Sequence, residues 1–128
     1  MNVSDFKRYE KKSIPQLIKI ATKHFNKFIR DRDSDKPCIS CGGRPEEAGH
    51  FYSGGHHSAL RFLENNVHGQ CKRCNRHLHG NLIEYEKRLK VRIGEDEVQK
   101  LHDIADYYKK NPYKWDRFAL YDIILKYK

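Results

Sequence analysis

One hundred and twenty-eight residues is the length of one domain, and eight tyrosines, six phenylalanines and one tryptophan give enough apolar bulk for a core, which excludes disorder across the whole chain. No apolar run approaches the roughly 20 residues that cross a membrane, and the first residues lack the apolar segment of a secretory signal, so we expect a soluble intracellular protein with no membrane partner. The formal net charge of +9 favours a polyanionic partner such as nucleic acid.

A single domain is expected over residues 1–128, beginning with a flexible basic N-terminus over 1–12. An N-terminal helical region follows over 13–36. Within it, apolar residues recur at helical spacing from 13 to 31, and Ser13 and Pro15 are suited to the cap and the first turn.

The segment after this helix contains short β-like patterns broken by pairs of glycines. A hairpin is therefore predicted, with one strand near 48–52 and another near 60–68. A helix should begin at the second cysteine pair, pass Gly80 and end at Gly94. Residues 94–128 should form C-terminal helices, interrupted near Asn111 and Pro112. The fold class expected from these elements is α+β.

The four cysteines stand in two pairs with two residues inside each pair and 29 residues between the pairs: Cys38, Cys41, Cys71 and Cys74. Two such pairs fill the four tetrahedral positions of a structural Zn²⁺ ion. Two disulfides are a poor alternative for an intracellular chain. A redox dithiol is also a poor one, because no βαβ pattern surrounds either pair. The sequence therefore predicts a zinc site that clamps the region between the pairs.

The order His50, Asn66, Asn75 around the second cysteine pair resembles the HNH, or His-Me finger, nucleases, in the variant with Asn at the third position. Several segments narrow the resemblance to the phage NinG (Rap) recombination nucleases, over roughly residues 12–105: Pro37–Gly42, Ala48–Phe51, Leu60–Phe62, Asn66–Cys71, Cys74–His77, Gly80–Leu82 and Tyr85. The resemblance implies a zinc-clamped ββα (HNH-like) core over 37–93 with flanking N- and C-terminal helices. It also implies a phage or prophage protein in the cytoplasm of a bacterial host.

In nucleases of this kind one histidine activates a water molecule, and His50 is the matching residue. Asn66 either orients His50 by binding the loop near Gly54 and Gly55 or touches the metal; the sequence favours orientation. Asn75 is the first candidate ligand of a catalytic Mg²⁺ or Mn²⁺ ion.

The second ligand of that ion is left open between two histidines. His79 lies four residues after Asn75 and so would share its helix face, whereas His77 belongs to the family motif. His68 is expected to support the site from behind. Many HNH enzymes have a metal-binding Asp where this chain has Gly49, and Glu47 is the nearest carboxylate, with its role open.

Basic residues near the expected site are candidates for contacts to DNA phosphates: Arg61, Lys72, Arg73, Arg76, Lys87 and Arg88. No base-reading motif is evident, so recognition by DNA shape is expected. The resemblance implies a structure-specific endonuclease for branched recombination intermediates, either Holliday junctions or D-loops. Two cuts across a junction would be made most simply by a homodimer. The alternative is a non-catalytic zinc-finger DNA-binding module.

Overall fold

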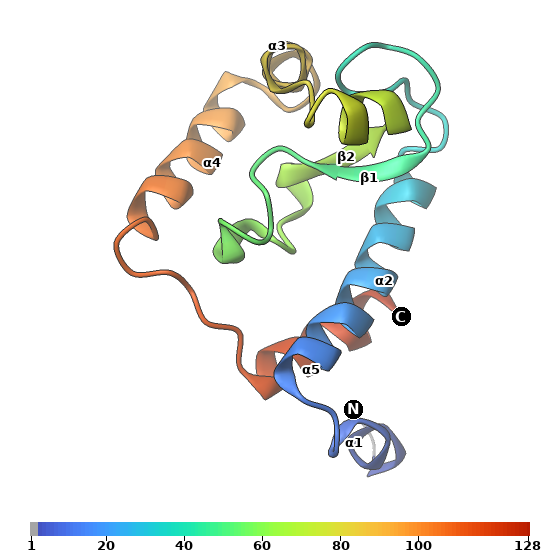
Figure 1. Ribbon diagram of the computed structural model, residues 1–128, viewed down its shortest axis with the longest axis vertical. Helices are drawn as coiled ribbons and strands as arrows, with labels where there is room; N and C mark the ends of the chain where they lie inside the picture. Colours follow the sequence, from blue (N-terminus) through green and yellow to red (C-terminus); the bar gives the residue numbers. More distant parts are fainter. Residues whose placement is uncertain (1–2) are drawn as a thin grey trace.

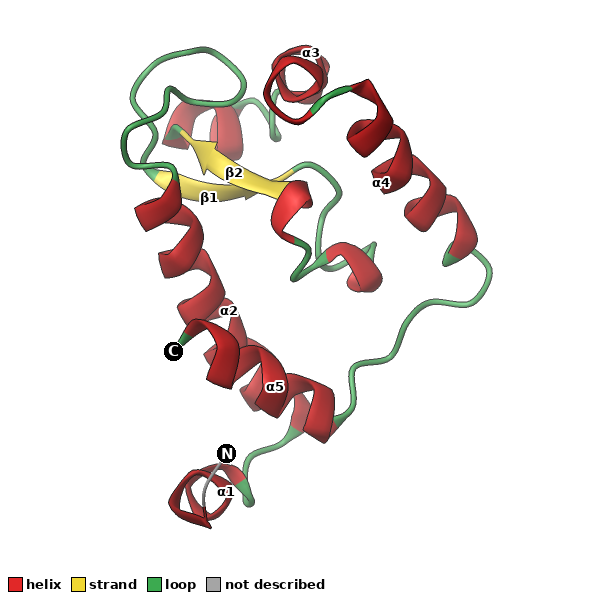
Figure 2. Cartoon of the chain, turned by 180° about the vertical axis from the view of Figure 1, so that it is seen from behind, coloured by secondary structure: helices red, strands yellow, loops and turns green. Residues whose placement is uncertain are grey.

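The computed structural model describes residues 3–128 and has an α+β architecture (Figures 1 and 2). Its helices and strands are, in chain order, α1 (Val3–Tyr9), α2 (Ile14–Arg32), β1 (Glu47–His50), β2 (Val67–Gln70), α3 (Leu82–Ile93), α4 (Glu95–Tyr107) and α5 (Arg117–Tyr127). Two 3-10 turns and one π-helical turn complete the regular structure: Ser58–Leu60, Glu64–Asn66 and Arg73–His77. Within the described residues, no helix has the length and apolar character needed to cross a membrane.

Helix α2 begins where the sequence predicts, because two reciprocal hydrogen bonds form a capping box at its N-terminus. The Ser13 hydroxyl accepts a hydrogen bond from the Gln16 amide at 3.3 Å, and the Gln16 side chain accepts one from the Ser13 amide at 2.8 Å. Pro15 occupies the first turn, where no backbone donor is required. The helix ends at Arg32, earlier than the end of the helical region expected over 13–36.

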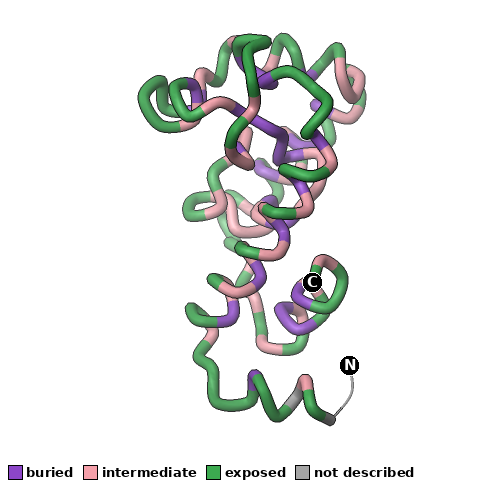
Figure 3. The backbone as a smooth tube through the Cα atoms, turned by 90° about the vertical axis from the view of Figure 1, so that its right-hand side faces the viewer, coloured by how far each residue is buried: buried purple, intermediate pink, exposed green. Residues whose placement is uncertain are grey.

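Two hydrophobic clusters lie on either side of the β1–β2 hairpin, which Figure 1 shows between the α2–α5 pair and the α3–α4 pair. The first cluster is built mainly from the inner faces of α2 and α5. The second joins α3 and α4 to the first cysteine loop through Ile39 and to the β1–β2 connection through Leu60. The buried stretches follow these inner faces (Figure 3). The hairpin is thus held between two helical layers.

The hairpin is shorter than predicted. β1 pairs antiparallel with β2, with Glu47 opposite Gln70 and His50 opposite Val67. The strand predicted over 60–68 was wrong for its first part, where residues 58–66 form turns. Leu60 and Phe62 explain this: on a strand they would face the same side, but here Leu60 packs in the α3–α4 cluster and Phe62 in the α2–α5 cluster.

The single helix predicted from the second cysteine pair to Gly94 was also wrong. After the π-helical turn the backbone becomes left-handed at His79, Gly80 and Asn81, with φ of 50°, 93° and 44°, and α3 begins only at Leu82. The break has a physical cause, since the Gly80 carbonyl points inward and accepts bonds from Ser40 Oγ at 3.1 Å and from a β2 side chain.

The N-terminal segment expected to be flexible is helical from residue 3 to residue 9, and residues 1–2 lie outside the described part of the chain. Tyr9 is buried and its ring centroid lies 6.2 Å from that of Tyr121 on α5. Lys128 forms an ion pair with Asp5 at 3.5 Å. α1 is thus helical and contacts α5 and the last residue of the chain. The flexibility expected over 1–12 stays a prediction.

Candidate functional site

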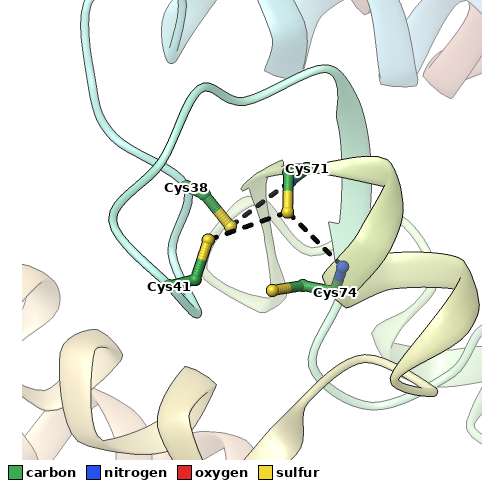
Figure 4. A group of neighbouring side chains, drawn as sticks. All are labelled: Cys38, Cys41, Cys71 and Cys74. Atoms are coloured by element: carbon green, nitrogen blue, oxygen red, sulfur yellow. Dashed lines mark hydrogen bonds between the residues drawn. The ribbon is translucent and has the colours of Figure 1, made fainter.

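The four cysteines converge on one point (Figure 4). Their sulfur atoms all lie within 4.8 Å of one another, as four ligands of one tetrahedral ion at about 2.3 Å would. In the described part of the chain, no other three or more His, Cys, Asp or Glu side chains come close enough to share an ion. The first pair comes from the loop after α2, and the second pair follows β2. A bound ion would therefore fasten this loop to the hairpin.

Backbone amides surround the sulfur atoms and prepare them for a metal. The Cys71 amide donates to Cys38 Sγ at 3.3 Å, the Gly43 amide to Cys41 Sγ at 3.4 Å and the Cys74 amide to Cys71 Sγ at 3.4 Å. Burial raises the pKa of the Cys38 thiol, but the amides more than offset it and lower that pKa to about 7. Burial raises the pKa of Cys71 and raises that of Cys74 to about 12, so a bound ion would displace the protons of these thiols. The fit to Zn²⁺ rests on four sulfur atoms that converge on one point.

A buried polar network connects this centre to the hairpin and explains why residue 49 is glycine. Gln70 donates to Ser40 Oγ at 2.8 Å and to the Gly80 carbonyl at 2.6 Å. Its amide oxygen lies so close to Gly49 that any Cβ at that position would be 1.9 Å away. An Asp at position 49, as in many HNH enzymes, would collide with Gln70.

His50, the expected base, lies at the end of β1 with its ring fixed in one orientation. Its Nε2 is 2.9 Å from the Arg61 carbonyl oxygen. A carbonyl only accepts hydrogen bonds, so Nε2 carries the proton and Nδ1 keeps a lone pair. Burial lowers the pKa of His50, and the Arg61 charge lowers it further. His50 is therefore neutral at neutral pH, with an acceptor nitrogen.

Asn66 is fully buried and binds the loop that follows His50. Its Oδ1 accepts from the Tyr52 amide at 2.9 Å, and its Nδ2 donates to the carbonyls of Tyr52 and Leu60 at 2.9 and 3.0 Å. Every described polar contact of the side chain is with backbone, so its geometry is that of the orienting role. The loop is held at these two residues, whereas the sequence pointed to Gly54 and Gly55.

A cleft of about 490 Å³ opens beside His50 and brings it together with His79. His79 comes from the left-handed turn before α3, so the break in the predicted helix brings the two histidines together. Four further polar side chains line the same cleft: Ser53, His56, His57 and Glu86. Glu86 is not among the candidates that the sequence suggests, because α3 reaches the cleft only through tertiary packing.

Asn75 lies in a different hollow, of about 330 Å³, which it shares with Glu47 at the other end of β1. The Asn75 Nδ2 donates to Glu47 Oε1 at 3.1 Å, and the Arg76 guanidinium binds the same carboxylate, with Nε at 3.0 Å. Arg76 above all, and then Asn75, hold the pKa of Glu47 below its usual value. Because residues 73–79 are not one α-helix, the geometric argument that paired Asn75 with His79 was wrong.

The two remaining predicted histidines differ in burial. His77 is exposed and makes no hydrogen bond with its side chain among the described residues. His68 is 3% exposed, and its Nδ1 lies 3.4 Å from the Tyr85 hydroxyl, which donates to the Gly49 carbonyl at 2.7 Å. Burial, reinforced by the charge of Arg32, lowers the pKa of His68 to about 3. His68 therefore lies behind β1 as a neutral packed side chain.

The basic residues expected to bind DNA do not form one surface. Lys72 and Arg76 line the hollow of Asn75, whereas Lys87 and Arg88 line a separate hollow beside Pro37 and Cys38. Arg73 is exposed on the π-helical turn, and the Arg61 side chain lies against Gly54 in the loop after β1.

The chain is similar to proteins of bacteriophages. A family model described as "Bacteriophage Lambda NinG protein" matches residues 4–128. The chain is 41% identical to "Protein ninG" of Escherichia phage lambda, over 101 residues that make up 77% of this chain and 47% of that protein. The identity is 41% to "Protein ninG" of Escherichia phage 933W, over 77% and 48% of the two chains.

The chain is 45% identical to "Protein ninG" of Salmonella phage P22, over 66% of this chain and 45% of that protein. The chain thus spans about half the length of the curated relatives it matches. No solved structure matches it significantly. With 125 of its residues covered by one family model and these identities over most of its length, the chain belongs to the NinG family.

Proposed function

We propose that the chain is the metal-dependent endonuclease part of a DNA recombination protein, with His50 as general base. The observation that carries this proposal is the orientation of His50: its Nε2 is occupied by the Arg61 carbonyl, and it lines a cleft wide enough for a phosphodiester. Its Nδ1 then accepts a proton from water, the water oxygen bonds to phosphorus, and the bond to the leaving oxygen breaks.

A divalent ion, when bound, would neutralise charge on the scissile phosphate and on the leaving oxygen. Mg²⁺-type ions use one or two protein ligands and otherwise water and substrate phosphate, so a group of three acidic or histidine ligands is not required. His79 lines the same cleft as His50 and is the ligand candidate that the geometry favours. Asn75 lies in the hollow at the other end of β1, where its Nδ2 binds Glu47 and its amide oxygen has no described hydrogen-bond partner. These two residues and His77 remain the candidate ligands.

The hairpin, the four cysteines and the turn after β2 support an HNH-like ββα assignment within the α+β fold. β1 carries His50 at its end, Asn66 closes the connection, and the segment after β2 carries Asn75. This is the order of the three motif residues in that superfamily. The family resemblance supplies the substrate class, branched DNA such as a Holliday junction or a D-loop, and a homodimer would suit two symmetric cuts.

Nicking of labelled DNA tests this function. Purified protein with Mg²⁺ or Mn²⁺ should cut a four-way junction faster than the linear duplex of the same sequence. His50→Ala should reduce cutting by about 10²- to 10⁴-fold, the usual contribution of a positioned base. His24→Ala, on α2 away from the cleft, is the matched control and should cut as the wild type does. Equal rates for a well-folded His50→Ala protein would contradict the assignment.

A non-catalytic zinc-finger DNA-binding module is the second candidate, favoured by the observation that only the cysteines form a metal group among the described residues. That function predicts tight binding to DNA with no cutting under any divalent ion. The nicking assay on wild-type protein separates the two candidates.

A further inference from the structure

The outer face of α2 carries basic residues that no other side chain neutralises. Lys19, Lys23 and Arg30 are spaced by four and then seven residues, so at 100° per residue they lie on one face, opposite the buried stripe of Leu17, Ala21, Phe25 and Ile29. All three are exposed, and none forms a hydrogen bond or ion pair with its side chain to any described residue. Over this length the helix extends about 16 Å.

The same face continues past the end of α2. Arg30 and Arg44, from the loop that carries the first cysteine pair, line one hollow, and Arg30 also lines the adjoining hollow with Lys72 and Arg76. We call Lys19, Lys23, Arg30 and Arg44 the α2 basic strip. Two segments, α2 and the loop that carries the first cysteine pair, thus bring unpaired cations to one surface.

The carboxylates nearest to the strip do not cancel it. Glu47 is neutralised by Arg76. Glu46 lines the hollow of Arg30 and Arg44 and keeps its charge, because its partner at Lys72 is a backbone amide, but it forms no ion pair with either arginine and is one charge against four. Some exposed lysines elsewhere have an acidic partner three residues away, as Lys87 has Glu84 and Lys100 has Glu97. Others, such as Lys90, form no ion pair with a described residue, so what sets the strip apart is that four unpaired cations share one face. Leaving four cations unpaired together favours an anion from outside the chain.

We propose that the α2 basic strip binds the phosphate backbone of a duplex DNA arm next to the cleavage cleft. One DNA strand offers a phosphate every 3.4 Å along the axis, so 16 Å of helix follows several of them. The strip adjoins the Glu47 end of β1, about 10 Å along the strand from His50, so these phosphates are not the one that is cut. The large exposed apolar side chains of the described residues all lie outside the strip, so a membrane surface fits it less well.

This inference rests on DNA being the substrate, and its test measures binding without cutting. Lys23→Gln, Arg30→Gln and Arg44→Gln are combined in one protein. The control combines Lys90→Gln, Lys109→Gln and Lys110→Gln, which remove equal charge from exposed positions on α3 and at the end of α4, across the molecule from α2 (Figure 2). Fluorescence anisotropy of a labelled four-way junction and a labelled duplex, without added divalent ion, gives affinity at several NaCl concentrations.

The strip variant should lose at least about tenfold in affinity at 0.1 M salt, and the slope of log affinity against log salt should fall by about 2 to 3, since each lost phosphate contact removes close to one unit. The loss should be equal for two unrelated DNA sequences, while the control changes by less than about twofold. An unchanged salt slope in the strip variant, or equal losses of DNA affinity in the strip variant and the control, would contradict DNA binding by the strip.

Strip-dependent binding to anionic lipid vesicles but not to DNA would also overturn it. If nicking depends on His50 but the strip variant keeps the salt slope of the wild type, only the proposed DNA binding by the strip is contradicted. If the salt slope changes as expected but the wild-type protein never cuts DNA, DNA binding by the strip is supported and the proposed endonuclease function is contradicted.

Discussion

At the scale of single residues, burial lowers the pKa of two histidines of the same hairpin, but their surroundings differ. His50 is held by a carbonyl at the edge of a cleft, where a lowered pKa keeps an acceptor nitrogen available to water. His68 is enclosed between β2 and α3, where the same physical cause keeps a packed side chain neutral. The difference lies in access: of the two histidines, only His50 lines the cleft of about 490 Å³.

His68 should make stability depend on pH. Its folded-state pKa of about 3 lies below the unfolded value of 6.5, so the unfolded chain binds the proton first. Stability is complete above pH 6.5 and falls as the pH drops toward 3. The stability advantage of wild type over His68→Gln should shrink by about 1.4 kcal/mol between pH 7.5 and pH 5.5. Urea unfolding of both proteins in zinc at the two pH values measures this, and a constant difference would contradict it.

The cutting rates of Asn75→Ala and His50→Ala should respond differently to added metal. Loss of a metal ligand weakens ion affinity, so excess Mn²⁺ should partly restore cutting to Asn75→Ala. Loss of the base leaves nothing for added metal to replace, so His50→Ala should stay inactive at every concentration. Nicking rates over a Mn²⁺ titration, with circular dichroism to verify folding, decide between the roles. If added Mn²⁺ restored cutting by His50→Ala, His50 would be assigned as a metal ligand and no longer as the base.

At the scale of elements, the connections matter more than the strands. The hairpin has only four residues in each strand, and its geometry is maintained by side chains that bind backbone: Asn66 in the loop after β1, and Gln70 and Ser40 at the turn before α3. That turn sets where His79 stands, so the cleft depends on it.

Gly80→Ala should therefore destabilise the protein more than Gly55→Ala does. Gly80 has a φ of 93°, and a Cβ there would lie 2.9 Å from a Leu82 side-chain carbon. Left-handed strain alone costs about 1 to 2 kcal/mol. Gly55 has no atom within 4 Å of its would-be Cβ and no left-handed φ, so Gly55→Ala should change stability by less than about 0.5 kcal/mol. Chemical unfolding of the two variants tests this, and equal stabilities would contradict it.

At the scale of the whole molecule, the two hydrophobic clusters depend differently on the metal. Ile39, next to a zinc ligand, belongs to the α3–α4 cluster, whereas the α2–α5 cluster contains no residue of either cysteine pair. Zinc binding contributes directly to the folding of the segments it joins. The two halves of the molecule should therefore respond unequally to metal removal.

Elemental analysis should find one zinc ion per chain, and Cys41→Ser or chelation should unfold residues 37–105 first. Amide hydrogen exchange is expected to rise in α3 and α4 while α2 and α5 keep part of their protection, because their shared core lacks metal ligands. Exchange that rises equally in all helices would contradict this separation. Protein purified without chelators, under reducing conditions, that contains no zinc would contradict the site itself.

The sequence by itself determined those features that depend on near neighbours in the chain. The cysteine spacing predicted the four-sulfur cluster, since two residues between thiols are enough to bring each pair to one ion. The helical period and the cap at Ser13 predicted the start of α2 to within a residue, whereas the helix ends four residues before the expected end at 36. The pattern around residue 50 also predicted a strand near His50, and β1 ends at that residue.

Only the tertiary structure decided the features that depend on contacts between distant segments. Leu60 and Phe62 are drawn into clusters on opposite sides of the hairpin, which turned an expected strand into 3-10 turns. The inward Gly80 carbonyl, bound by Ser40 forty residues earlier, broke an expected helix and brought His79 rather than Asn75 beside His50. Periodicity reports which face of a local element is apolar; it carries no information about a hydrogen bond that a remote side chain makes to the backbone, and such bonds fixed the cleft.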